Sequence, residues 1–146
     1  MKKIERVKHE LETIARKHNG LCIPEEVVKV AKNKDSILHD YFEWDNTKAS
    51  HLYRLWQARK LIVTIRYEPY EEKEAVQYFV SLVSDRKTSG YRIISDVMSD
   101  EEMRMELLKE ALDMMLYFKK KYSILTELTK IFIEIEKTTE QLKKQS

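Results

Sequence analysis

The chain has 146 residues, of which 42% are hydrophobic, enough for one domain, or a domain with an appendage, to bury a core. Charged residues make up 36% but nearly cancel to a formal net charge of +2, so the total charge gives no argument for nucleic acid. The N-terminal residues alternate charged and apolar side chains without a long apolar run, which argues against a secretory signal or a membrane span. We therefore expect a cytoplasmic protein.

Glycine and proline divide the first third of the chain. Helical spacing of apolar residues predicts a helix that ends at Asn19 and Gly20. Pro24, followed by two glutamates, predicts the start of a short second helix that ends near Asn33. The single cysteine, Cys22, has apolar neighbours and is interpreted as a buried structural thiol.

Residues 37–60 hold five aromatic residues beside a strong helix start. One or two helical turns are predicted over 37–44, with Asp45 as the N-cap of a third helix over 47–60. The predicted core stripe of this helix consists of Ala49, Leu52, Tyr53 and Trp56.

A β-rich segment follows. The alternating, β-branched residues 61–67 predict a strand, and an acidic turn leads to a second strand over 75–84. A tight polar loop over 85–90 then precedes a third short strand over 91–94. This pattern predicts a small antiparallel sheet.

Two helices close the chain. Ser99 and Glu102 have the spacing of a capping box that opens a long amphipathic helix, and a second helical run follows it. Their length exceeds what one small sheet can cover, so they predict a helical hairpin or an oligomerisation surface. We therefore expect a domain over 1–96 and a helical hairpin over 97–146.

Three segments of the chain are distinctive, namely HNGLCIPEEVVKVAKNKDSILHDYFEWDNTKASHLYRLWQARKLI, SLVSDRKTSGYRIISDVMSDEEMRMELLKEAL and KKYSILTEL. They resemble a widespread family of small bacteriophage and prophage proteins, and the resemblance extends over nearly the whole chain. The words LHDYFEWD and YRLWQARKLI are the most distinctive. The resemblance implies a phage origin, so the expected cytoplasm is that of the host cell, and it assigns no catalytic residue.

The order of three helices and a hairpin resembles a winged helix-turn-helix module, giving an α+β fold class. In this hypothesis one face of the third helix enters the major groove of DNA and the loop near 86 contacts phosphate. The predicted DNA-binding residues are Thr47, Lys48, Ser50, His51, Arg54, Gln57, Arg86, Lys87 and Arg92. The alternative is that they form the solvated face of an amphipathic helix, because the chain lacks a dominant basic patch.

Other patterns have simpler explanations beside a functional one. His39 and Glu43 have the spacing of two metal ligands on one helical face, but nearby carboxylates more often cap helices or pair with arginine. The aromatics of residues 41–56 suit a base-stacking platform or a core, and core is favoured. Methionines around the long helix suit an adaptable partner surface or core filling.

The sequence therefore predicts a non-enzymatic phage accessory protein that binds DNA or regulates through it. The alternative is a module that binds a host or phage protein through its C-terminal helices. No nucleophile, base or phosphate loop indicates catalysis, so neither a cofactor nor a metal is expected. The expected partners are double-stranded DNA or a protein, without a membrane, and a second copy of the chain.

Overall fold

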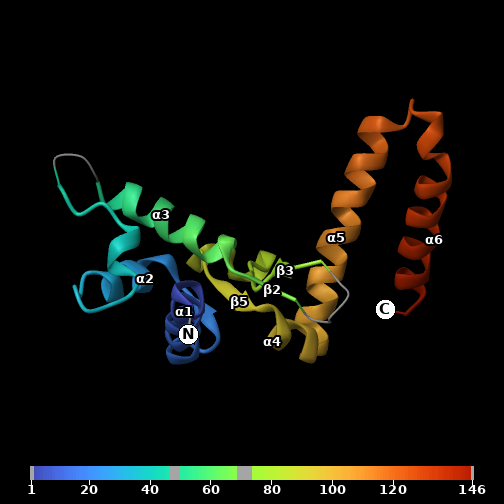
Figure 1. Cartoon of the computed structure of the whole chain (residues 1–146). Helices are drawn as coiled ribbons and strands as arrows, with labels where there is room; N and C mark the ends of the chain where they lie inside the picture. The colour runs from blue at the N-terminus through green and yellow to red at the C-terminus, as the bar shows by residue number, and fades with distance from the viewer. Residues whose placement is uncertain (1, 47–49, 69–73, 146) are drawn as a thin grey trace. The chain divides into compact units, whose positions relative to one another are not determined.

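A computed structural model describes residues 2–46, 50–68 and 74–145 and divides the chain into two compact units (Figure 1). The first unit ends at Glu101 and the second begins at Glu102. Helices predominate, and the described strands form two small antiparallel sheets in the first unit. The predicted α+β class is confirmed.

The first unit begins with two helices separated by a tight turn and a short strand. Helix α1 spans Lys3–Lys17, strand β1 spans Leu21–Cys22 and helix α2 spans Pro24–Ala31. Asn19 and Gly20 have positive φ values of 54° and 83°, so the chain leaves α1 through the left-handed region and turns into β1. Both predicted helices are confirmed.

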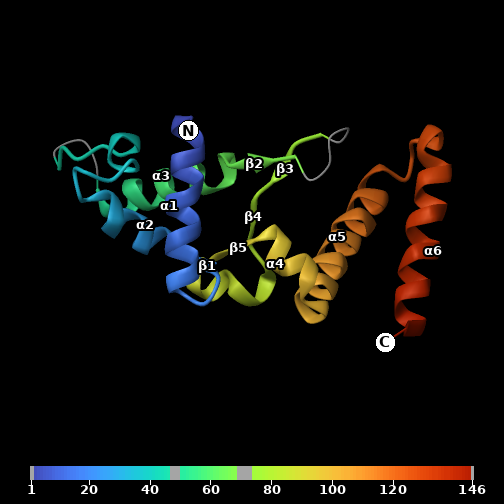
Figure 2. The same cartoon turned by 60° about the horizontal axis from the view of Figure 1, so that its bottom comes forward.

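Strand β1 lies at one edge of a three-stranded antiparallel sheet with the order β1–β5–β4 (Figure 2). Strand β4 spans Phe79–Val80 and β5 spans Tyr91–Ile93, and the short helix α4, Ile94–Ser99, follows β5 directly. A separate ribbon pairs β2, Arg66–Tyr67, with β3, Val76–Gln77. The larger sheet joins the turn after α1 to the end of the first unit.

Helix α3 spans His51–Thr64, which corrects the predicted boundaries. Its N-cap is Ser50, whose hydroxyl accepts a hydrogen bond from the Tyr53 N–H at 3.3 Å, rather than Asp45. The helix also continues through most of the strand predicted over 61–67. Ile62 extends the buried helical face of α3, and burial of that face outweighs the weak β-propensity of the Ile-Val-Thr run.

The strand predicted over 75–84 is divided between the two sheets at Tyr78. The Tyr78 N–H donates to the Ile65 carbonyl, and the Tyr78 carbonyl accepts from the Ile94 N–H. The Tyr78 hydroxyl donates to Glu12 on α1, and burial together with this carboxylate raises the pKa of the hydroxyl. After β4, the 3₁₀ helix η2, Val83–Thr88, takes most of the predicted polar loop.

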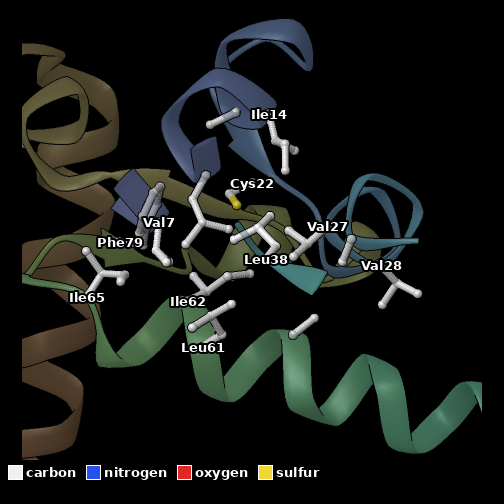
Figure 3. Close-up of a cluster of buried hydrophobic side chains, with 14 of the residues drawn as sticks. Val7, Ile14, Cys22, Val27, Val28, Leu38, Leu61, Ile62, Ile65 and Phe79 are labelled. Carbon is white, nitrogen blue, oxygen red and sulfur yellow. The ribbon is translucent and has the colours of Figure 1, made fainter. Parts of the chain in front are cut away.

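The core of the first unit lies between α1, α2, α3 and the larger sheet (Figure 3). Its side chains come from segments far apart in the sequence, which is why the core holds the helices and the sheet together. The labelled members are Val7, Ile14, Cys22, Val27, Val28, Leu38, Leu61, Ile62, Ile65 and Phe79.

Cys22 is expected to resist alkylation in the folded protein. Its side chain is fully buried, and burial raises the pKa of the thiol to about 12. The reactive thiolate is therefore nearly absent at about pH 8. Intact-mass measurement after iodoacetamide treatment should show no adduct on the native protein and full modification in denaturant. Equal labelling rates in the two states would contradict this burial.

The second unit is a hairpin of two helices. Helix α5 spans Glu101–Tyr122, the 3₁₀ turn η3 spans Thr126–Leu128 and helix α6 spans Thr129–Gln145. The predicted C-terminal helices are confirmed. Ser99 does not cap α5 as predicted, because it ends α4 and its hydroxyl donates to the Asp96 carbonyl at 3.0 Å.

Candidate interaction surfaces

The connection between α2 and α3 folds into a loop rich in aromatic residues. The Trp44 indole N–H donates to the His39 carbonyl at 3.0 Å, and the two rings stack with centroids 5.1 Å apart. The His39 Nδ1 lies 2.8 Å from the carbonyl oxygen of Ala31, at the end of α2. Phe42 is buried, while Tyr41 and Trp44 pack against the core. This part of the predicted aromatic core is confirmed.

Two polar residues of α3 hold this loop. The Arg54 guanidinium donates to the Glu43 carbonyl at 3.4 Å and to Asn46 Oδ1 at 3.3 Å, and it lies 5.6 Å from the Trp44 ring centroid. Gln57 Oε1 accepts from the Glu43 N–H at 3.2 Å. The sequence places Arg54 and Gln57 on a DNA-facing surface, whereas the structure directs both toward the loop. Base contacts by either would have to replace these bonds.

A buried ion pair joins η2 to β5. Arg92 Nε and Nη2 donate to the two carboxylate oxygens of Asp85 at 2.6 Å and 2.8 Å. Arg92 Nη1 also donates to the Asn19 carbonyl at 3.5 Å, in the turn before β1. Arg92 therefore links three segments of the first unit. The phosphate contact predicted for it stays a prediction.

The remaining predicted DNA-binding residues do not all lie on one helix or strand. His51 is exposed in the first turn of α3, and Arg86 and Lys87 are exposed on η2. DNA contact by these side chains stays a prediction. Two further candidates lie outside the described residues, namely Thr47 and Lys48.

The apolar stripe predicted for the core lies instead at the surface of α3. Leu52 is 75% exposed, Tyr53 44% and Trp56 45%. The Tyr53 and Trp56 rings stack with centroids 5.6 Å apart, and the Lys60 Nζ lies 4.3 Å from the Trp56 centroid. We call Leu52, Tyr53, Trp56 and Lys60 the α3 strip. The core prediction is wrong for Leu52, Tyr53 and Trp56, and Ala49 lies outside the described residues.

The error arises because α3 carries two apolar stripes. Leu55, Ala58 and Ile62 follow one another at spacings of three and four and are all buried. This second stripe continues into residues 61–67, for which the sequence predicts a strand. A helix predicted to end at residue 60 therefore contains only part of the stripe. A helix extended to Thr64 shows both stripes, and only one of them faces the core.

The hairpin of the second unit also exposes apolar side chains. Its buried residues are Leu112 on α5 with Phe132 and Ile135 on α6. The Phe118 ring lies 6.3 Å from that of Phe132, so the two helices lie side by side there. Large exposed residues of the hairpin include Met114, Met115, Tyr117, Phe118, Ile124, Leu125, Ile131 and Ile133.

The described residues do not form a cluster of metal ligands. Nowhere in residues 2–46, 50–68 and 74–145 are three or more His, Cys, Asp or Glu side chains grouped to hold a metal ion. His39 and Glu43 do not share a helix, because η1 spans His39–Tyr41 and Glu43 accepts from the Asp45 N–H at 2.9 Å. The interaction surfaces are therefore the features from which a function can be argued.

No family model, curated protein or solved structure matches the chain. Within the part of the chain that the structure describes, every helix is too short or too polar to cross a membrane.

Proposed function

We propose that the protein is a non-enzymatic protein-binding module whose contact surface is the α3 strip. The observation that carries this proposal is the exposure of the stacked Tyr53 and Trp56 rings beside Leu52. Tyrosine and tryptophan are enriched among the residues that contribute most to protein interfaces. Contiguous exposed apolar groups of this kind mark binding surfaces more often than isolated exposed side chains do.

The α3 strip is held rigidly before any partner binds. The opposite side of α3 is buried through Leu55 and Ala58, so the helix cannot rotate without loss of core contacts. Arg54 and Gln57 fix the neighbouring loop. Little conformational entropy is then lost on binding, and the contact area of the two rings contributes more fully to affinity.

The charge of α3 indicates the chemistry of the partner. Lys60 lies beside the Trp56 ring, Arg59 is exposed one residue earlier, and helix α3 contains no acidic residue. A partner segment that combines apolar side chains with carboxylates complements both the apolar rings and the positive charge of this surface. The resemblance to bacteriophage and prophage proteins supports a phage or bacterial host protein as its source.

DNA binding is the second candidate, favoured by the order of the elements. A helix, a strand, two helices and then the strands that complete the β1–β5–β4 sheet follow the order expected of a winged helix. A helix-turn-helix joins its helices by three or four residues, however, whereas residues 32–50 separate α2 from α3. The outward face of α3 also exposes the apolar residues Leu52, Tyr53 and Trp56. For these two reasons we propose DNA only as the second candidate.

Selection from a displayed library of random peptides tests the proposal. The full chain and its Trp56→Ala variant serve as parallel targets. We expect the wild-type protein to enrich peptides with apolar anchors and Asp or Glu between them, and the variant to enrich none of these. The same peptides on both targets would contradict the role of Trp56. Displacement of the peptides by duplex DNA would instead favour the second candidate.

Trp56→Ala should leave the fold stable, because the side chain is nearly half exposed. We expect the free energy of unfolding to fall by about 1 kcal/mol or less, as for other surface changes. Leu55→Ala, at the adjacent buried position, should cost about 2–5 kcal/mol. Urea denaturation followed by tryptophan fluorescence measures both variants, since each of them keeps Trp44. A loss above about 2 kcal/mol for Trp56→Ala would place this ring in the core.

A further inference from the structure

Helix α5 is apolar over a wider arc than its partner helix α6 can cover. At about 100° per residue, Leu112 and Leu116 face the seam with α6. A second apolar stripe lies roughly 90° away around the same helix. Its members are Leu108, Ala111, Met115, Phe118 and Tyr122. One antiparallel neighbour needs an arc of only about 100°, so α6 leaves much of the second stripe uncovered, although Phe118 at its edge contacts Phe132 of α6.

The exposed part of this stripe continues onto α6. Within the stripe Met115 is 48% exposed and Phe118 44%, and Met114 at its edge is 67% exposed. On α6, Ile131 is 55% exposed and directly precedes Phe132, which contacts Phe118. We call Ala111, Met114, Met115, Phe118 and Ile131 the hairpin face.

We propose that the hairpin face binds the hairpin face of a second copy of this chain, with the two α5 helices antiparallel. Two hairpins joined in this way form a four-helix bundle, and a twofold axis brings the same residues of both copies together. No residue of the α3 strip takes part, so the inference goes beyond the proposed function.

Charge favours a second copy in the antiparallel orientation. Helix α5 carries Lys119, Lys120 and Lys121 at its C-terminal end, and Glu106, Glu110 and Asp113 lie earlier in the same helix. A parallel pair would bring the two lysine runs together. An antiparallel pair centred near Met115 brings Lys121 of one copy level with Glu110 of the other, and both residues lie on the same flank of the hairpin face, so their attraction acts within the screening length of about 8–10 Å.

The exposed area is of the size that such a dimer needs. A large apolar side chain has a solvent-accessible surface on the order of 150–200 Å² when fully exposed. At their exposed fractions, Met114, Met115, Phe118 and Ile131 together expose roughly 400 Å² per copy. Half-buried residues of the same arc add to this area, among them Leu108, Ala111 and Tyr122. Two copies thus approach the total of about 1,000 Å² that separates specific interfaces from incidental contacts.

Sedimentation equilibrium of the full chain tests the dimer. We expect dimers at about 10–100 µM, with Phe118→Glu raising the dissociation constant at least a hundredfold by placing a charge in the interface. Tyr117→Glu is the matched control, because Tyr117 is 69% exposed and lies on the polar side of α5. Met114→Glu repeats the test away from the Phe132 contact, and circular dichroism verifies that each variant keeps its helices. A monomeric wild type, or equal effects at 117 and 118, would overturn the proposal.

Cysteine cross-linking tests the orientation. In an antiparallel pair centred near Met115, Met115→Cys should form a disulfide with its own copy under mild oxidation. Phe118→Cys should cross-link to Ala111→Cys in a mixture better than to itself, and Tyr117→Cys should not cross-link. The buried Cys22 does not interfere. Efficient pairing of 118 with 118 along with 111 with 111 would show a parallel dimer. A monomer with an unreactive cysteine at 115 would mean that the rest of the chain covers this face, and either result refutes the inference.

Discussion

Asp85→Ala should lower the free energy of unfolding of the first unit by about 3–5 kcal/mol. Asp85 is 7% exposed, and both of its carboxylate oxygens accept hydrogen bonds from Arg92. Removal of the carboxylate leaves the Arg92 charge in a mostly buried position without its counterion. The desolvation of Arg92 then loses the compensation that this carboxylate gives, and η2 loses this link to β5.

Urea denaturation followed by tryptophan fluorescence measures this loss, since both tryptophans of the chain, Trp44 and Trp56, belong to the first unit. The matched control is the double variant Asp85→Leu with Arg92→Met. It removes both charges while it keeps apolar volume, so its stability should exceed that of Asp85→Ala. If Asp85→Ala unfolds at the wild-type urea concentration, the ion pair has no structural role.

Phe79→Ala should also cost about 3–5 kcal/mol, because it removes the largest fully buried side chain of the core. Phe79 lies on β4 opposite Ile93 and meets the Tyr78 ring edge-on at a centroid distance of 5.1 Å. Its loss opens a cavity where the sheet meets the helices. The position cannot close around this cavity, since β4 is hydrogen-bonded to β5 in the sheet.

The same fluorescence measurement tests this prediction. Val83→Ala is the control, because Val83 is 51% exposed only four residues along the chain and its change should stay within about 0.5 kcal/mol. A Phe79→Ala variant with less than about 1 kcal/mol of destabilisation would show that this core relaxes freely.

The helices near strong local signals could be predicted from the sequence. Asn19 and Gly20 end α1 through positive φ values, and Pro24 begins α2, so both boundaries depend on neighbouring residues alone. The ends of α3 depend on tertiary burial instead. Ile62 has β-propensity but shares a buried helical face with Ala58, and no local pattern shows that the core lies on that side.

The candidate site was harder to predict for the same reason. Arg54 and Gln57 have the pattern of a solvated helical face, yet the loop that contains Glu43 folds over them. The position of that loop follows from the stacking of Trp44 on His39, which helical periodicity does not encode. The face of α3 that reaches the solvent is consequently the one that carries Trp56.

The affinity of the selected peptides for wild-type protein and for Trp56→Ala tests the central claim most directly. Fluorescence anisotropy with labelled peptides gives both dissociation constants, and Lys87→Ala serves as a control on the predicted DNA-contacting side chains. We expect Trp56→Ala to weaken binding at least tenfold, about 1.4 kcal/mol, while Lys87→Ala leaves the affinity unchanged. Equal affinity for wild type and Trp56→Ala would contradict the claim that the α3 strip is the contact surface.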